Sequence, residues 1–143
     1  MKIIDSFEGE HRFLSNFYSS PLQLEGIIYP TIEHAFQAMK TKDKNKRIEI
    51  SKLQTPGEAK RAGRKVKLRE DWEKIKLEVM EFLVRLKFKN YIDLKNELLA
   101  TDNAELIEGN WWNDRFWGIC KGRGENNLGK ILMKVRDELR EDN

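Results

Sequence analysis

Cysteine, histidine and long apolar runs are scarce in this sequence. The single cysteine, Cys120, cannot form a disulfide within the chain. Two histidines and one cysteine do not make a credible set of zinc ligands, so we expect no metal site. A Walker loop and a dinucleotide fingerprint are also missing, and we expect no cofactor. No stretch is apolar enough for a membrane span and no leader marks secretion, so we expect a cytoplasmic protein without a membrane partner.

The excess of positive charge is small. The chain has 27 Lys and Arg against 24 Asp and Glu, a formal charge of +3, which excludes strong overall attraction to nucleic acid. A local basic patch is still compatible with this balance, and residues 59–69 supply six cations. A solvated surface is the ordinary interpretation of such a tract. Beside an aromatic pocket the tract would instead hold a sugar phosphate, with Arg64 as the best candidate.

No repeat, low-complexity tract or Pro/Gly/Ser linker divides the 143 residues, and 39% hydrophobic content is enough for one core. Short apolar runs at Ile3-Ile4 and between Leu22 and Tyr29 predict two or three short strands. Helical signals dominate the rest of the chain. The predicted fold class is therefore α+β: a mostly α-helical single domain, residues 1–143, with a few short β-strands near the N-terminus.

Caps and apolar spacing predict the helices. Thr31 is a candidate N-cap for a helix to about Lys40. The segment Thr55 to Glu58 is a capping box with proline at the first helical position, and its helix should reach about Gly63. Two shorter helices are expected over about 94–99 and 126–140. The longest helix begins near residue 71, and its predicted buried stripe consists of Trp72, Ile75, Val79, Phe82 and Leu86.

Two polar stretches are not explained by packing alone. In Arg12 to Tyr18, Ser15 and Asn16 interrupt an aromatic run in an expected loop, and a local turn is the ordinary interpretation. On the helix after Thr31, Glu33, Gln37 and Lys40 share one face, because residues four and seven apart are aligned. That face is either a solvated surface or a set of groups that act together.

Three of the four tryptophans lie between Trp111 and Trp117, among asparagines and Asp114. Such a cluster fits neither a regular strand nor a regular helix. It indicates either aromatic rings that stack on a ligand or a small aromatic core beneath a loop. The glycine-rich basic segment 121–129 opens a helix, where backbone amides with Lys121 and Arg123 would suit a phosphate.

Together these stretches resemble the NADAR family, including its YbiA-like members. The matches span nearly the whole chain and keep their order, which makes a chance match improbable. They are Phe13-Leu14-Ser15-Asn16-Phe17, the segment Tyr29 to Lys40 with its Glu33-His34 and Phe36-Gln37-Ala38 pairs, Gly63-Arg64 to Trp72, Leu106-Ile107-Glu108-Gly109-Asn110 to Asp114-x-Phe116-Trp117-Gly118, and Asn127-Leu128-Gly129-x-x-Leu132-Met133.

The resemblance implies an N-glycosidase, a hydrolase of N-glycosyl bonds. YbiA-like members are associated with phosphoribosyl-amine intermediates of riboflavin synthesis, and other NADAR domains with removal of ADP-ribose from the amino group of guanine. In both reactions a glycosyl carbon is stabilised while the departing nitrogen is protonated. The implied partner is a substrate that contains ribose phosphate or ADP-ribose, including ADP-ribosylated nucleic acid.

Carried onto this sequence, the resemblance implies that Glu33 is a catalytic carboxylate, activating water or stabilising positive charge at the anomeric carbon. Lys40 would attack the imine carbon that ring opening exposes and form a Schiff base, which requires a depressed lysine pKa. Asp114 is implied as a partner carboxylate or an anchor for a ribose hydroxyl. The expected substrate-binding residues are Asn16, Phe17, His34, Gln37, Arg64, Trp72, Asn110, Trp112, Trp117, Gly118 and Asn127.

Two alternatives belong to other classes. A non-catalytic module that binds ADP-ribose or a nucleotide would need the tryptophans and the basic tract but not the carboxylates. A helical interaction protein would use its tryptophans as core. Within the hydrolase class, Lys121 and Arg123 slightly favour ADP-ribosylated guanine, whereas Trp111 departs from the small or polar residue usual in the family and leaves the base preference open. The sequence leaves the oligomeric state unknown.

Overall fold

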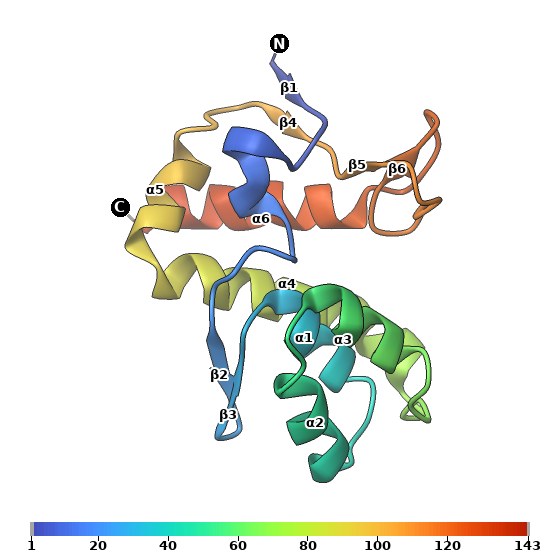
Figure 1. Ribbon diagram of the computed structural model, residues 1–143. Helices are drawn as coiled ribbons and strands as arrows, with labels where there is room; N and C mark the ends of the chain where they lie inside the picture. Colours follow the sequence, from blue (N-terminus) through green and yellow to red (C-terminus); the bar gives the residue numbers. More distant parts are fainter. Residues whose placement is uncertain (1, 143) are drawn as a thin grey trace. The chain divides into compact units, whose positions relative to one another are not determined.

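The computed structural model describes residues 2–142, and the contacts along the chain divide it into two compact units (Figure 1). The middle unit comprises residues 16–87. The terminal unit combines the residues up to Ser15 with those from Phe88 onward. The boundary falls inside helix α4, Trp72–Asn90. Within residues 2–142, no helix is long and apolar enough to cross a membrane.

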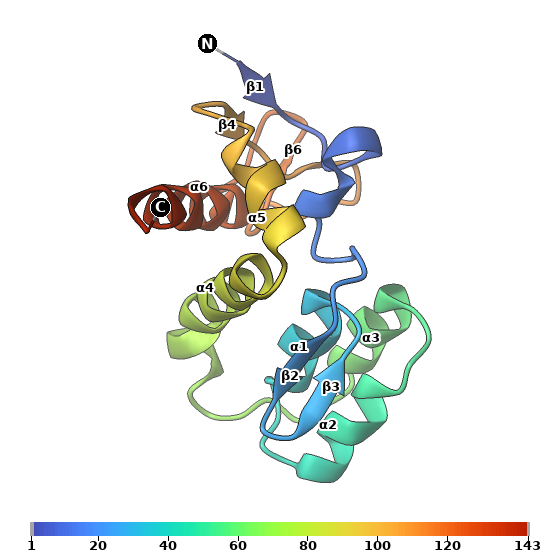
Figure 2. The same ribbon diagram turned by 90° about the vertical axis from the view of Figure 1, so that its left-hand side faces the viewer.

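The middle unit begins with a hairpin of β2, Leu22–Leu24, and β3, Ile27–Tyr29. The two strands pair antiparallel with Leu22 opposite Tyr29, and both of these side chains are buried. Glu25 and Gly26 at the tip have positive φ angles of 50° and 81°, the backbone that a two-residue turn with the twist of the strands requires. Figure 2 shows the hairpin beside α1. The short strands predicted for this segment are confirmed.

Three short helices follow the hairpin: α1, Ile32–Ala38, α2, Lys44–Ser51, and α3, Pro56–Gly63. The capping prediction is confirmed at α3, where Thr55 Oγ1 accepts the Glu58 N–H at 3.1 Å and donates to the Glu58 carboxylate at 3.1 Å. Thr31 caps α1 in the same way by accepting the N–H of His34. Helix α2 was not predicted, although Asp43 caps it.

The predicted buried face of α4 is confirmed at Trp72 but is wrong at Phe82. Phe82 is 50% exposed, and Ile75, Val79 and Leu86 are only partly buried. The structure instead buries an adjacent arc of the helix, in which Lys87 replaces an apolar residue. Spacing identifies the apolar side chains of a helix, but the packed neighbours decide which arc of the helix is covered. The buried residues of α4 are Trp72, Met80, Leu83, Val84, Lys87 and Phe88.

The terminal unit contains two parallel strand pairs, of which the sequence predicted only the strand at Ile3–Ile4. β1, Ile3–Ile4, pairs with β4, Glu105–Leu106, and β5, Gly109–Asn110, pairs with β6, Ile119–Cys120. The segment that we expected to be a loop begins within a 3-10 helix, Gly9–Leu14. The predicted helices at 94–99 and 126–140 are confirmed as α5, Ile92–Leu99, and α6, Asn127–Glu141.

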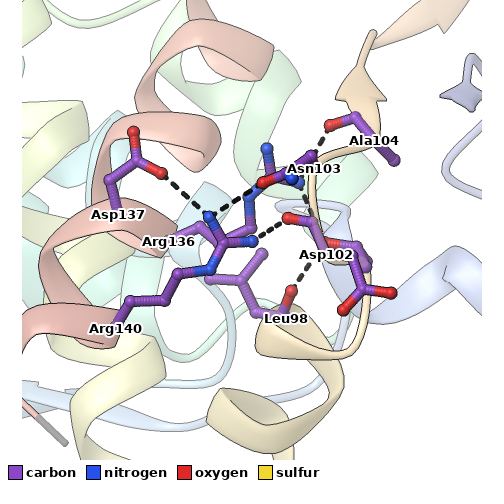
Figure 3. A network of polar contacts seen from close by, with 8 residues as sticks. Leu98, Asp102, Asn103, Ala104, Arg136, Asp137 and Arg140 are labelled. Atoms are coloured by element: carbon purple, nitrogen blue, oxygen red, sulfur yellow. Dashed lines mark hydrogen bonds and ion pairs between the residues drawn. The ribbon is translucent and has the colours of Figure 1, made fainter. Parts of the chain in front are cut away.

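Two arginines of α6 fasten the α5–β4 connection (Figure 3). The buried Arg136 donates through Nη1 to Thr101 Oγ1 at 3.0 Å and to the Ala104 carbonyl at 2.9 Å. Arg140, which is more exposed, donates to Asp102 O and Asn103 Oδ1. Because buried carbonyl and hydroxyl groups need partners, Arg136 stabilises a connection that lacks regular hydrogen bonding. The predicted α+β class with mostly helical content is confirmed.

Candidate functional site

The predicted polar face of α1 exists, and it is buried. Glu33 is 8% exposed and Gln37 is 5% exposed. The Gln37 side-chain amide donates from Nε2 to Glu33 Oε2 at 2.5 Å, so the two side chains are held together. Lys40 lies in the turn that ends the helix, where its N–H donates to Gln37 O. Burial of Glu33 and Gln37 rules out a solvated surface for this part of the helix, and a shared role for the groups stays a prediction.

Helix α3 approaches this face through a glycine. A Cβ at Gly63 would overlap Gln37 Oε1 and crowd the rest of the Gln37 amide. Glycine is therefore required at this position by close approach rather than by backbone conformation. Because nothing larger than hydrogen fits, Gly63 fixes the position of Gln37 and, through it, that of the Glu33 carboxylate.

Two buried acceptors beside Glu33 lack partners. Asn16 Oδ1 and Gln37 Oε1 have no hydrogen-bond partner among residues 2–142. Asn16 is adjacent to Glu33, because its backbone carbonyl accepts the Glu33 N–H at 3.1 Å, while its Nδ2 donates to Met80 Sδ at 3.5 Å. Buried carbonyl oxygens without partners are costly and rare. Both are suited to accept hydrogen bonds from hydroxyl or amino groups of a ligand.

The pKa of Lys40 is lowered from the usual lysine value. Burial is the main cause, since it disfavours the ammonium form, and the nearby positive charges of Arg64, Lys60 and Lys76 act in the same direction. The Glu33 carboxylate opposes the shift. A larger fraction of the amine is therefore neutral at a given pH, which is the property that a lysine nucleophile requires.

Trp72 and His34 are buried in contacts within the middle unit. Trp72 is buried and its ring packs against Phe36, with centroids 5.0 Å apart. His34 is fully buried, and its ring nitrogens lie 2.8 Å from Thr31 Oγ1 and 2.9 Å from the Leu53 carbonyl. Burial lowers the pKa of His34, which favours the neutral ring. These contacts tie α1 to its cap and to residue 53 and occupy both nitrogens.

In the terminal unit, Asp114 organises the loop that follows β5. Its Oδ1 accepts the N–H groups of Phe116 and Trp117 at 3.1 and 2.9 Å. Asn110 closes the loop, because its Oδ1 accepts the Asp114 N–H and its Nδ2 donates to the Asp114 carbonyl and to Glu108 Oε2. The Asp114 carboxylate therefore holds two backbone N–H groups of this loop, contacts that the sequence did not reveal.

The start of α6 differs from the predicted phosphate cradle. The N–H groups of Asn126, Asn127 and Leu128 donate to the carbonyls of Gly118, Phe116 and Trp117. Asn127 also donates from Nδ2 to the Phe116 carbonyl at 2.9 Å. These amides bind the tryptophan loop to the helix, so a phosphate cannot use them. A Cβ at Gly118 would overlap the Glu108 carbonyl and carboxylate, which places Gly118 inside the same packed loop.

Two tryptophans of the cluster remain accessible. Trp111 is 83% exposed and Trp112 is 44% exposed, and their rings meet edge to face with centroids 5.5 Å apart. Trp117 instead packs edge to face on Phe116, with centroids 4.8 Å apart. The cluster is thus divided between a partly buried pair, Phe116 and Trp117, and an exposed pair, Trp111 and Trp112, and a role in stacking on a ligand stays a prediction.

The predicted site residues form two sets, one in each unit. The middle unit brings together the side chains around Glu33 and Lys40, with Phe17 following Asn16 in the preceding loop, and the terminal unit brings together those around Asp114. Sequence reasoning missed Lys60 and Lys76 as neighbours of Lys40, although Lys60 lies in the basic tract and Lys76 follows Trp72 by one helical turn. Within residues 2–142, no group of three or more His, Cys, Asp or Glu is placed to hold a metal ion.

Comparison with known proteins places this chain in a class. The NADAR domain model matches residues 5–140. N-glycosidase YbiA of Escherichia coli strain K12 is 41% identical over 128 residues, which cover 87% of this chain and 79% of that protein. A riboflavin biosynthesis protein of Vibrio vulnificus strain YJ016 is 40% identical over 134 residues, 92% of this chain but 36% of that longer protein. The NMR structure of E. coli YbiA has a TM-score of 0.87 at 38% identity and covers 99% of this chain and 86% of that one.

The class that these relatives define is an enzyme, a hydrolase of N-glycosyl bonds with an α+β fold. The chain belongs to the NADAR domain family. The family, the fold and the enzyme class expected from the sequence are thereby confirmed, and a module that binds without catalysis is not favoured. The roles of individual residues stay predictions.

Proposed function

We propose that this N-glycosidase cleaves the bond between a phosphorylated ribose and an amino nitrogen, with phosphoribosylamino-pyrimidine intermediates of riboflavin synthesis as the leading substrates. The buried Glu33–Gln37 pair beside a lysine of lowered pKa is the observation that carries the proposal. The name of the Vibrio vulnificus relative, a riboflavin biosynthesis protein, supports this substrate class. A ribose-containing substrate agrees with the enzyme class of the family.

Glu33 stabilises the positive charge that develops at the anomeric carbon. Its carboxylate is almost fully shielded from water, where an opposite charge interacts more strongly than in solvent. The hydrogen bond from Gln37 fixes one of its oxygens. Asn16 Oδ1 and Gln37 Oε1 accept hydrogen bonds from ribose hydroxyls, which supplies the partners that these buried atoms otherwise lack.

Lys40 acts as the nucleophile through a Schiff base. Ring opening breaks the bond between C1 and the ring oxygen, which takes up a proton, while the nitrogen lone pair forms a C=N bond. The neutral Lys40 Nζ adds to C1, and the base amine leaves after it is protonated, so that C1 is bonded to lysine as an imine. Water hydrolyses this imine, which releases the open-chain sugar phosphate and restores Lys40.

Asp114 shapes the tryptophan loop within the terminal unit. One of its carboxylate oxygens is already held by two backbone N–H groups. We therefore assign it a positioning role within this unit and retain the other predicted residues of the unit, Asn110, Trp112, Trp117, Gly118 and Asn127, as proposed substrate contacts. In the middle unit, Phe17 and Arg64 are proposed contacts of the sugar phosphate. His34 and Trp72 hold α1 in place.

A second candidate substrate is ADP-ribose on the guanine amino group of nucleic acid. The exposed tryptophan pair Trp111–Trp112 favours it, because unstacked bases bind to accessible aromatic rings. Arg115, Lys121 and Arg123 are exposed in the following segment, where Arg115 Nε donates to the Cys120 carbonyl and Cys120 pairs with Arg123. A phosphate backbone would be attracted to these three cations.

The proposal is tested by incubating the purified protein with the phosphoribosylamino-pyrimidine and, separately, with an ADP-ribosyl-guanine oligonucleotide, and following the released sugar phosphate by mass spectrometry. Release from the pyrimidine that disappears in Glu33→Gln supports the leading substrate. Release from the oligonucleotide alone, reduced by Trp111→Ser, supports the second candidate. If sugar phosphate is released from neither substrate, both candidate substrates are rejected.

A further inference from the structure

We propose that Lys60, Arg64 and Lys76 form, next to Lys40, a binding site for the phosphate of the substrate. The inference rests on the proposed function, since it assigns a place to the phosphate of the same sugar. Of these three cations, only Arg64 was expected from the sequence to contact a substrate. The site is argued from the faces of α3 and α4 that meet α1 within the middle unit.

The first face belongs to α3. Lys60 precedes Gly63 by three residues and Arg64 by four, so Lys60 shares a face of this helix with each of them. Gly63 is in close contact with the Gln37 amide, which shows that this side faces α1. Lys60 is partly buried and Arg64 is exposed at the end of the helix. The two cations therefore flank the contact point beside the turn that carries Lys40.

The second face belongs to α4. Trp72 packs its ring on Phe36, which lies one turn before Lys40 in α1. Lys76 follows Trp72 by four residues, so it lies on the same side of α4. The backbone also brings the helices together, because the Arg69 N–H donates to the Lys40 carbonyl at 2.8 Å. Lys76 thus lies on the side of α4 that meets α1.

The charges that reach Lys40 are mostly positive. Arg64, Lys60 and Lys76 are the positive groups close enough to disfavour its ammonium form, and Glu33 is the carboxylate that opposes them. Lys76 also pairs with the exposed Glu73 at 2.8 Å, which neutralises part of the excess. Positive charges gathered around one partly buried amine attract an anion. A phosphate dianion suits this position, because lysines and the arginine guanidinium bind phosphate oxygens well.

The cations have different roles in this arrangement. Lys60, Arg64 and Lys76 hold the phosphate, while Lys40 is directed to C1 and Glu33 stays beside the anomeric centre. A bound dianion favours the ammonium form of Lys40, so phosphate alone should make this amine less reactive. Phosphate is therefore expected to protect Lys40 from an amine-reactive reagent in the unmodified protein.

The binding test uses isothermal titration of ribose 5-phosphate and of ribose with the full chain. Lys60→Gln and Lys76→Gln should each weaken ribose 5-phosphate binding about tenfold, because each removes a charge-assisted hydrogen bond. Lys76→Arg should restore most of the affinity. Lys65→Gln is the matched control, since Lys65 is an exposed cation of the same tract outside the proposed site, and it should change little.

The outcomes separate this inference from the proposed function. Equal binding by the Lys60, Lys76 and Lys65 variants overturns the phosphate site even if the enzyme turns over its substrate. Binding that depends on Lys60 and Lys76 without any turnover supports the site and rejects the proposed function. If the variants fail to fold, labelling of wild-type Lys40 decides: protection by inorganic phosphate, but not by chloride at equal ionic strength, supports the site, and equal labelling overturns it.

Discussion

The Gln37 amide and the Glu33 carboxylate are joined by a hydrogen bond of 2.5 Å inside the middle unit, and both side chains are more than nine-tenths buried. Gln37 is in turn confined by Gly63. A catalytic carboxylate needs a fixed position because small displacements from the productive geometry are costly. The position of Glu33 therefore depends on a glycine of another helix that contributes no side chain.

Gly63→Ala should displace Gln37 and weaken activity more than stability. The added methyl overlaps Gln37 Oε1, and such overpacking costs about 1–3 kcal/mol of unfolding free energy. We expect kcat to fall about tenfold or more, because the carboxylate loses its fixed geometry. Gly57→Ala is the matched control, since a Cβ there has its nearest neighbour at 3.7 Å. Urea unfolding and steady-state kinetics of both variants check this, and equal kcat values would contradict it.

Lys87→Met should remove a pH dependence of stability. Burial lowers the pKa of Lys87 to about 7 in the folded chain, against 10.5 for an ordinary lysine. Between these values the unfolded chain binds the proton and the folded chain does not, so the unfolding free energy rises with pH from about 7 to about 10.5.

Methionine fills a similar volume without a charge, so the variant should gain on the order of a few kcal/mol below pH 7 relative to wild type. Between about pH 7 and about pH 10.5, the unfolding free energy of the variant should lack the increase that Lys87 causes in wild type. Unfolding titrations at several pH values measure both effects. Parallel curves for the two proteins would show that Lys87 does not titrate in this way.

The variants Asp114→Asn and Asp114→Ala distinguish a positioning role of the Asp114 side chain from a requirement for its negative charge. Asparagine keeps an oxygen that can accept the Phe116 and Trp117 N–H groups, whereas alanine removes it. We expect the asparagine variant to stay within about fivefold of wild type in kcat/KM and the alanine variant to lose about 100-fold, mainly as KM if base contacts are lost. An equal loss of kcat/KM in both variants would instead show that the reaction requires the negative charge of Asp114.

Arg136→Met should destabilise the terminal unit. It leaves Thr101 Oγ1 and the Ala104 carbonyl without this donor in a buried setting, a loss of about 2–4 kcal/mol. Arg140→Met removes contacts in an exposed setting and should cost about 0–1 kcal/mol. Urea denaturation of the two variants provides the comparison. Similar losses would mean that the buried contacts of Arg136 contribute no more than those on the surface.

Local features were predictable from the sequence, and tertiary features were not. The Thr55 capping box depends on residues three apart, so its helix could be located directly. The two-residue strands of the terminal unit are too short for an alternation pattern. Helix α2 has few apolar residues, and no apolar face indicated it. Spacing in α4 misplaced the buried face because Lys87 is buried there while Phe82 is half exposed.

In the candidate site too, local features could be predicted from the sequence and tertiary features could not. The alignment of Glu33 with Gln37 follows from helical spacing, and the resemblance to the family gave Glu33 and Lys40 their expected roles. The cations around Lys40 come from α3 and α4, so only the packed structure brings Lys60 and Lys76 to it. The two backbone hydrogen bonds to Asp114 depend on the loop conformation, which no residue spacing specifies.

The most direct test of the account is to trap the covalent intermediate on Lys40. Wild-type protein is mixed with the phosphoribosylamino-pyrimidine and sodium borohydride, and the adduct is located by peptide mass spectrometry. The account predicts a reduced sugar-phosphate adduct on Lys40, formed faster as pH rises toward and through the lowered pKa of this amine, and absent in Lys40→Arg. Full turnover by Lys40→Arg, with no adduct on wild-type Lys40, would contradict it.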